Sequence, residues 1–257
     1  MSKRKTKAEL NKHKQQSLKK LENHIDSWIS SKNPDDNGRA DKLCYWISDY
    51  VNFLKRERTF DPKHSIKYKR GDIVKIHLGY RVGSEEGGLH FAIVLDVNNS
   101  KASNTLTVIP LTSIKPGKSI HENNVSLGNE VFTSVIGKHD KLHNKLILQQ
   151  QKLIDELKAL STKKSLSAED EQRLLELKHM ANDFTDALKE LTEIKESILN
   201  MKSGSIALVN QITTISKIRI YDPVYTKNVL YGIRLSPTTM QTIDEKICEL
   251  FLPRNKK

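Results

Sequence analysis

The sequence predicts an α+β protein in which one β-rich domain is interrupted by a pair of long helices. Apolar residues alternate with a period of two within residues 67–137 and again within 204–220, a pattern typical of strands. Between these stretches, within residues 138–202, apolar residues recur every three to four positions, which is the spacing of a helix. Two further helical patterns precede the first strand.

Residues 1–66 are predicted to form a helical arm. Its first helix carries an apolar stripe made of Leu10, Leu18, Leu21, Ile25 and Trp28. The turn-forming residues SKNPDDNG (31–38) are expected to end this helix. A second helix follows with its own stripe, made of Leu43, Trp46, Ile47, Tyr50 and Leu54. We expect the two helices to pair with each other or to dock on the β-rich domain.

The arm is also basic. Residues 1–70 contain 18 lysines and arginines against 9 acidic residues, and so hold most of the formal net charge of +12. Such a surface raises the local concentration of polyanions, of which nucleic acid is the commonest inside cells. A solvated, solubilising face would have the same composition. Charge alone therefore leaves both interpretations open.

The β-rich domain is predicted to combine residues 67–137 with residues 203–257. The expected strands are DIVKIHL (72–78), HFAIVLDV (90–97) and LTVIPLTS (106–113), a short edge at 123–132, and more strand within 204–220. In the second strand, Phe91 and Ile93 face one way while His90 faces the other. A final helix is expected at 235–251, because this segment starts with a Ser-Pro cap and carries one apolar stripe.

Residues 138–202 are predicted to form an antiparallel helical coiled-coil hairpin inserted into that domain. One apolar seam is continuous and consists of Leu177, Met180, Phe184, Ala187, Leu191, Ile194, Ile198 and Met201. A shorter seam upstream consists of Leu146, Leu153, Leu157 and Leu160. A polar turn separates them, and Ser167 with Asp170 makes a capping box for the second helix. Lengthening a surface loop costs little entropy, so the β-rich domain can tolerate such an insertion.

Several features predict a cytoplasmic protein that does not enter membranes. Cys44 and Cys248 are far apart, each within an apolar helical pattern, so we expect buried thiols in a reducing compartment. The start, MSKRKTKAEL, is basic but no apolar segment follows it, which argues against a secretory signal. No apolar run approaches the roughly 20 residues that are needed to span a bilayer.

Four motifs occur in series in the β-rich domain: RGDIV, then VGSEEGGLHFAIVLDVNN, then TVIPLTS, then SIALVNQITTISKIRI. With the helix that begins at LSP, this series closely resembles the MazF/PemK-type toxins, over residues 70–137 and 203–252. The resemblance implies an SH3-like β-barrel and a homodimer. It also implies cleavage of single-stranded RNA without a metal or other cofactor, and a cognate antitoxin protein as partner.

The resemblance also implies the residues of a site. The predicted catalytic residues are His90 and Thr112. His90 stands where the family has an arginine that is tied to catalysis, and Thr112 falls on the family's conserved hydroxyl position. The predicted substrate-binding residues match family positions or lie close to them, and are Arg81, Glu85, Gly87, Gly88, Ser113, Gln211 and Lys217.

The replacement of arginine by His90 changes the expected chemistry. Cleaving RNA without a metal requires a base for the 2′-hydroxyl proton, an acid for the leaving 5′-oxygen, and donors for the phosphoryl charge. Arginine clamps phosphate but exchanges protons poorly, whereas histidine, with a reference pKa of about 6.5, exchanges them at neutral pH. We therefore expect His90 to act as the base, Arg81 to restore some positive charge, and Thr112 to donate a hydrogen bond to the scissile phosphate.

Each of these residues also has an interpretation without a functional role. His90 can be a strand-edge histidine, Thr112 a β-former at a strand end, and Glu85 a residue that shapes its loop. Lys217 can be a solvated charge. Besides an endoribonuclease toxin, the sequence therefore also allows a catalytically weakened binding module, or an interaction protein whose helical hairpin does the main work.

A metal site is the weakest of the candidate signals. His139 and His143 are four residues apart on an expected helix, which is a metal-ligand spacing. We interpret this spacing as chance, because neither an adjacent glutamate nor a third ligand is evident.

Overall fold

The computed structural model describes residues 5–253, which divide into two compact units. The first unit comprises residues 5–59 and 79–88, and the second comprises 60–78 and 89–253. Helices are combined with strands that pair only in antiparallel fashion, so the predicted α+β class is confirmed.

The first unit contains helices α1 (Lys7–Ile29) and α2 (Pro34–Glu57), together with the loop 79–88. The break between the helices is shorter than predicted, because residues 34–38 already belong to α2. The Asn33 side chain accepts a hydrogen bond from the Asp35 N–H and so caps α2. Pro34 fits the first helical position, where a backbone N–H would have no helical partner.

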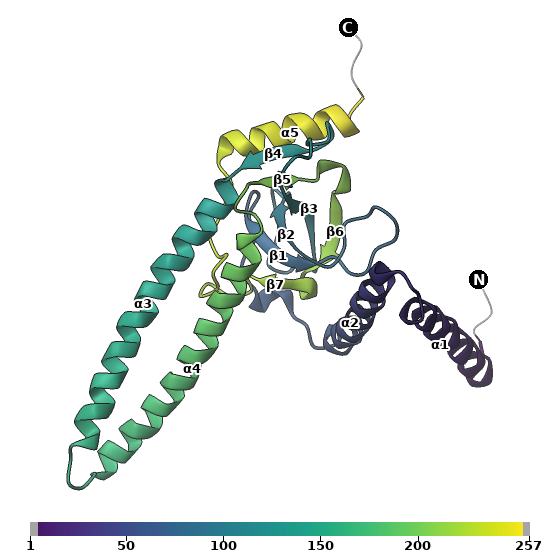
Figure 1. The fold of residues 1–257 in the computed structure, drawn as a ribbon. Coiled ribbons are helices and arrows are strands. Elements are labelled where there is room, and N and C mark those ends of the chain that lie inside the picture. Colours follow the sequence, from purple (N-terminus) through teal and green to yellow (C-terminus); the bar gives the residue numbers. More distant parts are fainter. Residues whose placement is uncertain (1–4, 254–257) are drawn as a thin grey trace. The chain divides into compact units, whose positions relative to one another are not determined.

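The second unit is built on a seven-stranded antiparallel sheet (Figure 1). Its strands are β1 (Ile73–His77), β2 (Leu89–Val94), β3 (Thr105–Ser113), β4 (Val125–Gly128), β5 (Ser205–Ala207), β6 (Thr213–Ser216) and β7 (Ile220–Asp222). The order across the sheet is β4-β5-β3-β2-β1-β7, and β6 also pairs with β3. This order leaves β4 and β7 as two ends and the sheet is not closed, so the predicted SH3-like barrel is not confirmed.

Three predicted strand segments differ from the structure. The segment 90–97 leaves the strand after Val94, where β2 ends. The segment 123–132 contains only the short strand β4, because helix α3 already begins at Glu130. The segment 204–220 is divided by the 3₁₀ turns η2 (Val209–Gln211) and η3 (Lys217–Arg219).

Pro110 explains where η2 interrupts the pairing along β3. Residues 105–108 of β3 pair with β6 and residues 111–113 pair with β5, so both partners lie along the same edge. Pro110 lies between these two stretches, and its carbonyl accepts a hydrogen bond from Leu208 on that edge. Proline has no N–H to donate into a ladder, so the partner chain turns there instead of continuing as one strand.

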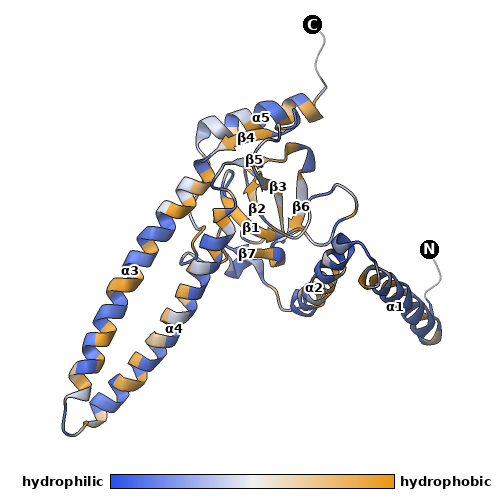
Figure 2. Cartoon of the chain, viewed as in Figure 1, coloured by the Kyte–Doolittle hydropathy of each residue, from blue (hydrophilic) through white to orange (hydrophobic). Residues whose placement is uncertain are grey.

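Both faces of the sheet are buried. On one face, Phe91 and Ile93 of β2 belong to a core that also includes residues of α3, α4 and α5. On the opposite face, Ala92 and Val94 belong to a second core that includes the buried Tyr68. The predicted alternation is therefore confirmed for residues 91–94 of β2. Figure 2 shows hydrophobic residues in the strands of the sheet, and hydrophobic and hydrophilic residues mixed along α3 and α4.

Helices α3 (Glu130–Ser161) and α4 (Ala168–Leu199) form the predicted antiparallel hairpin and lie side by side (Figure 1). The predicted capping box is present, because Ser167 and Asp170 each accept a hydrogen bond from the backbone N–H of the other. Buried residues at the root of the hairpin join the sheet core, namely Val131, Val135, Leu191, Ile194 and Ile198. Met180, farther out along the seam, is 49% exposed, and coiled-coil packing stays a prediction.

Helix α5 (Pro237–Phe251) starts at the predicted Ser-Pro cap, with the Ser236 side chain accepting from the Thr239 N–H. Glu130, at the start of α3, accepts hydrogen bonds from Ser236 and Thr239 and so ties the hairpin root to this helix. Cys44 and Cys248 are exposed, so the prediction of buried thiols is wrong: both lie beside, rather than on, the buried stripe of their helix. No helix within residues 5–253 has the length and apolar character that crossing a membrane requires.

Asp222 places a carboxyl group in the interior at the end of β7. Asp222 lies opposite Lys75 in the ladder between β7 and β1. It is only 4% exposed, and its Oδ1 atom accepts a hydrogen bond from the Leu230 N–H. Among residues 5–253, no group donates a hydrogen bond to its Oδ2 atom. Burial raises the pKa of Asp222 from 3.8 to about 6, and the charge of Glu190 adds to this effect.

This raised pKa predicts that Asp222 lowers stability at neutral pH. Because the folded pKa is the higher one, the contribution to folding is complete below about pH 4 and is lost as pH rises through about 6. Asp222→Asn keeps the acceptor for Leu230 and removes the titration. The free energy of unfolding of the variant minus that of the wild type, measured in urea, should increase by on the order of 2 kcal/mol from pH 4 to pH 7. A stability difference that is the same at both pH values would contradict this assignment.

Candidate functional site

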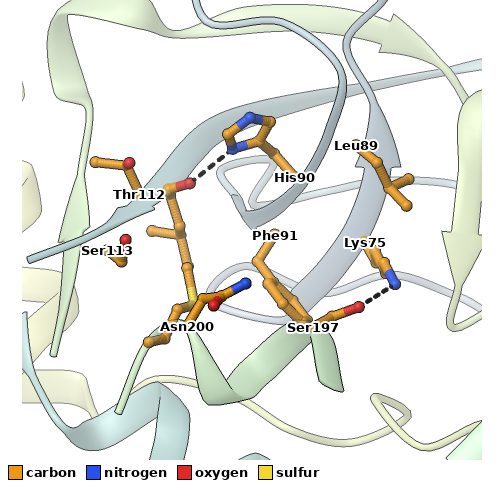
Figure 3. Close-up of a pocket in the computed structure, with 10 residues that line it drawn as sticks. Lys75, Leu89, His90, Phe91, Thr112, Ser113, Ser197 and Asn200 are labelled. Atoms are coloured by element: carbon orange, nitrogen blue, oxygen red, sulfur yellow. Dashed lines mark hydrogen bonds between the residues drawn. The ribbon is translucent and has the colours of Figure 1, made fainter. Parts of the chain in front are cut away.

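A pocket opens where strands β2 and β3 separate. The two strands pair from Val94↔Val108 to Ala92↔Pro110, and their ladder ends there. Beyond that point β2 stays paired with β1, while β3 pairs with β5. The diverging ends and the end of α4 enclose a pocket of about 280 Å³ (Figure 3). Its lining residues are Lys75, Leu89, His90, Phe91, Leu111, Thr112, Ser113, Ser197, Asn200 and Met201.

His90 bridges the gap between the diverging strands. Its ring nitrogen Nδ1 lies 3.1 Å from the carbonyl oxygen of Leu111, across the fork (Figure 3). A carbonyl oxygen only accepts hydrogen bonds, so Nδ1 carries the proton in this contact. The neutral ring then has its lone pair on Nε2. The backbone of β3 thus orients the imidazole, with Nδ1 as the donor in this contact.

Thr112 lies on the same pocket. The pairing of Ala92 with Pro110 implies that His90 and Thr112, each two residues farther on, share one face of the sheet. Thr112 is paired with Ile206 in the ladder between β3 and β5, which holds its backbone in place. Ser113 also lines the pocket, although strand alternation directs its side chain to the opposite face.

The glycine-rich loop belongs to the first unit, with four of the predicted substrate-binding residues: Arg81, Glu85, Gly87 and Gly88. The Gly88 N–H donates to the Gly79 carbonyl at 2.8 Å and closes the neck of the loop. A Cβ at Gly87 would lie 2.8 Å from that same carbonyl, so only glycine fits there. Arg81 and Glu85 form an ion pair at 3.7 Å, which supports the interpretation of Glu85 as a residue that shapes the loop.

The structure does not bring Gln211 and Lys217 to the pocket. Gln211 ends the η2 turn, and Lys217 begins η3. Lys217 is only 3% exposed; its ammonium donates to the Ser100 carbonyl at 2.8 Å and lies over the Tyr68 ring. Burial lowers the pKa of Lys217. A lysine held in this way connects two segments of the chain, which differs from the solvated charge that the sequence allowed.

Sequence reasoning did not assign seven of the ten lining residues to a site. Three of them are apolar residues next to predicted ones, and the other four are Lys75, Ser197, Asn200 and Met201. Lys75 alternates with apolar residues in β1 and resembles any strand lysine. The other three lie at the end of the hairpin, outside the motif series, and Met201 was assigned only to the apolar seam. No sequence signal connects these two segments, because their proximity results from the docking of α4 on the sheet.

The histidine pair on α3 carries no sign of a metal centre. The rings of His139 and His143 stack with centroids 5.8 Å apart, and Nδ1 of His139 contacts the Asp140 carboxylate at 2.9 Å. Within the described range 5–253, no group of three or more His, Cys, Asp or Glu side chains could hold a metal ion.

One segment of the chain matches a known protein family. Residues 69–178 match the family described as the PemK-like, MazF-like toxin of type II toxin-antitoxin systems. The chain carries a PemK/MazF-like toxin domain. The match covers less than half of the 257 residues and runs from the segment before β1 through α3 into α4. A search of curated proteins found no match to the chain.

The end of the match does not coincide with the end of the toxin domain's sheet. Residues 203–252, in which the sequence also resembles the family, lie outside the matched segment. Strands β5 and β6 nevertheless pair with β3, and β7 pairs with β1. The matched segment therefore depends on later residues to complete its sheet.

The crowding at Gly87 predicts that Gly87→Ala will distort the glycine-rich loop. Its added Cβ would approach the Gly79 oxygen and the Arg81 side chain, so the hydrogen bond that closes the loop should weaken. Amide hydrogen exchange of residues 79–88 should accelerate at least about tenfold, corresponding to a loss of about 1.4 kcal/mol. Gly38→Ala is the control, because Gly38, like Gly87, has no positive φ, but a Cβ there meets open space. Unchanged exchange in Gly87→Ala would contradict the steric argument.

Proposed function

We propose that this protein is a toxin-like endoribonuclease that cleaves single-stranded RNA by attack of the 2′-hydroxyl on the adjacent phosphate. The family match supports this reaction class. The observation that carries the choice of site is the contact between His90 and the Leu111 carbonyl, at the mouth of a pocket that Thr112 also lines. The reaction as proposed needs no metal or other cofactor.

In this proposal His90 is the general base. With Nδ1 bound to the Leu111 carbonyl, Nε2 can take the 2′-hydroxyl proton. The resulting imidazolium can then protonate the leaving 5′-oxygen, or a second group can do so while His90 returns its proton to water. Imidazole exchanges protons at neutral pH, which the guanidinium of the usual family arginine does poorly.

Thr112 is proposed to donate its hydroxyl hydrogen to a phosphoryl oxygen. Donors that are already positioned stabilise the charge that develops on these oxygens, and they need no reorganisation during the reaction. The pairing of Thr112 with Ile206 keeps its backbone fixed, which supports such a role. Ser113, the next residue, is proposed to contact RNA from the other side of the strand.

The proposed partners follow from the family. A toxin of a type II toxin-antitoxin system normally pairs with an antitoxin protein, and we propose such a partner here. We also propose a cytoplasmic homodimer that acts on cellular RNA.

A binding module without catalysis is the second candidate function. The observation that favours it is the half-buried position of His90, whose Nδ1 is engaged by the backbone. In this interpretation the role of His90 is structural: its side chain connects β2 with β3. The two candidates predict different results in a cleavage assay.

The test is cleavage of labelled single-stranded RNA in EDTA by purified protein that is free of any antitoxin. Wild type should cut, His90→Ala should lose at least about 100-fold in rate, and Thr112→Val should lose at least about tenfold. His179→Ala, which removes an exposed histidine of α4, should keep wild-type activity. Thermal unfolding of each variant shows whether it is folded.

The outcomes separate the candidates. If wild type binds the RNA but leaves it intact, the protein is a binding module and the nuclease proposal is wrong. If His90→Ala cuts as fast as wild type, His90 is not the base.

A further inference from the structure

The inserted hairpin supplies one wall of the pocket. Ser197 belongs to the last turn of α4, Asn200 is the residue that caps this helix, and Met201 follows it. Between them, Ile198 is completely buried in the core that the hairpin root shares with the sheet. Because Ile198 anchors this turn, the side chains on either side of it have a defined position at the pocket (Figure 3).

Lys75 of β1 faces this wall. Its ammonium donates to the Ser197 hydroxyl at 2.7 Å (Figure 3). That hydroxyl in turn donates to the Glu193 carbonyl at 2.7 Å. An ammonium group has three donors, so this contact uses only one of them. Lys75 is half-buried, and burial lowers its pKa, although the charges of Asp222 and Glu193 act in the opposite direction. The ammonium would therefore gain from an anion that entered the pocket.

The lining of the pocket is suited to an anion. It includes the ammonium of Lys75, the imidazole of His90, and the hydroxyl or amide groups of Thr112, Ser197 and Asn200, but no carboxylate. Because Lys75 pairs with Phe91, its side chain leaves the sheet on the face opposite His90, so the two side chains line the pocket from its two sides. Its volume of about 280 Å³ is near the lower end of the range for small-ligand sites, so it suits one nucleotide rather than a folded RNA.

We propose that Lys75, with Ser197 and Asn200 of the hairpin, forms a subsite for an RNA phosphate close to the linkage at His90. The proposal rests on the proposed function, because it takes single-stranded RNA as the ligand. The ammonium takes over the phosphate clamping that His90 cannot provide, and the hairpin becomes part of the RNA site. A lysine binds phosphate as a point charge, which suits a phosphate that must be held but does not react.

The test measures binding of a single-stranded 2′-O-methyl RNA of about ten nucleotides, a ligand that cannot be cleaved by 2′-hydroxyl attack. Fluorescence anisotropy at several salt concentrations gives the affinity and its salt dependence. Lys75→Gln should bind about tenfold more weakly, and the slope of log affinity against log salt should fall by about 0.7, the value for one lost phosphate contact. Lys75→Arg should retain most of the affinity, because it keeps the charge.

Two further variants keep the test independent of folding. Lys195→Gln is the matched control, since it removes the same charge from an exposed position on α4 and should change affinity less than about twofold. Asn200→Asp places a negative charge at the exposed end of α4 without touching the bond between Lys75 and Ser197, and it should also weaken binding. Thermal unfolding identifies any variant that is not folded.

The subsite is refuted if Lys75→Gln binds with the affinity and salt slope of wild type, or if Lys195→Gln weakens binding equally. It is also refuted if wild type does not bind the oligonucleotide at low salt. These results do not depend on cleavage. If binding depends on Lys75 but the protein leaves ordinary RNA intact, the nuclease proposal is refuted and the subsite is retained. If the protein cleaves RNA but Lys75→Gln binds as wild type does, the subsite is refuted and the nuclease proposal is retained.

Discussion

The pairing of β3 with strands from both halves of the chain is the constraint on which the second unit depends. β3 pairs with β2 on one edge, and with β6 and then β5 on the other. β5 and β6 follow the hairpin in the sequence, so both ends of the hairpin must meet at this sheet. Val131 and Ile198, at the start of α3 and the end of α4, consequently lie in the sheet core. The root of the hairpin is therefore part of the domain's interior.

The same constraint produces the pocket. At Pro110, β3 changes its partner on one edge from β6 to β5. On the other edge, the ladder between β3 and β2 ends at the same residue. In a continuous ladder the backbone groups at the fork would pair with each other; here the His90 imidazole meets the Leu111 carbonyl instead. A polar side chain held by a backbone acceptor at an opening of the sheet is a suitable arrangement for proton transfer, because its tautomer and orientation are set before substrate arrives.

In the proposed site, proton transfer and phosphate binding are assigned to different side chains. The resemblance to the toxin family places an arginine at this position, and arginine clamps phosphate well but is a poor base. Here an imidazole stands at that position, and an ammonium from β1 lines the same pocket. Separating the two tasks allows each group to suit its own chemistry. It also connects the hairpin to the site, because Ser197 of α4 accepts a hydrogen bond from that ammonium.

The sequence by itself determined the element types, because helix stripes, strand alternation and caps such as Ser167 and Ser236 are local patterns. It also indicated that His90 and Thr112 lie close together, since their motifs occur in a recognisable series, and both residues line one pocket. The tertiary structure alone decided that Lys75 meets Ser197, a residue 122 positions away, and that both cysteines face solvent. Local spacing describes how one segment folds, whereas these contacts depend on which helix face docks on the sheet, and that choice is made by packing across the whole domain.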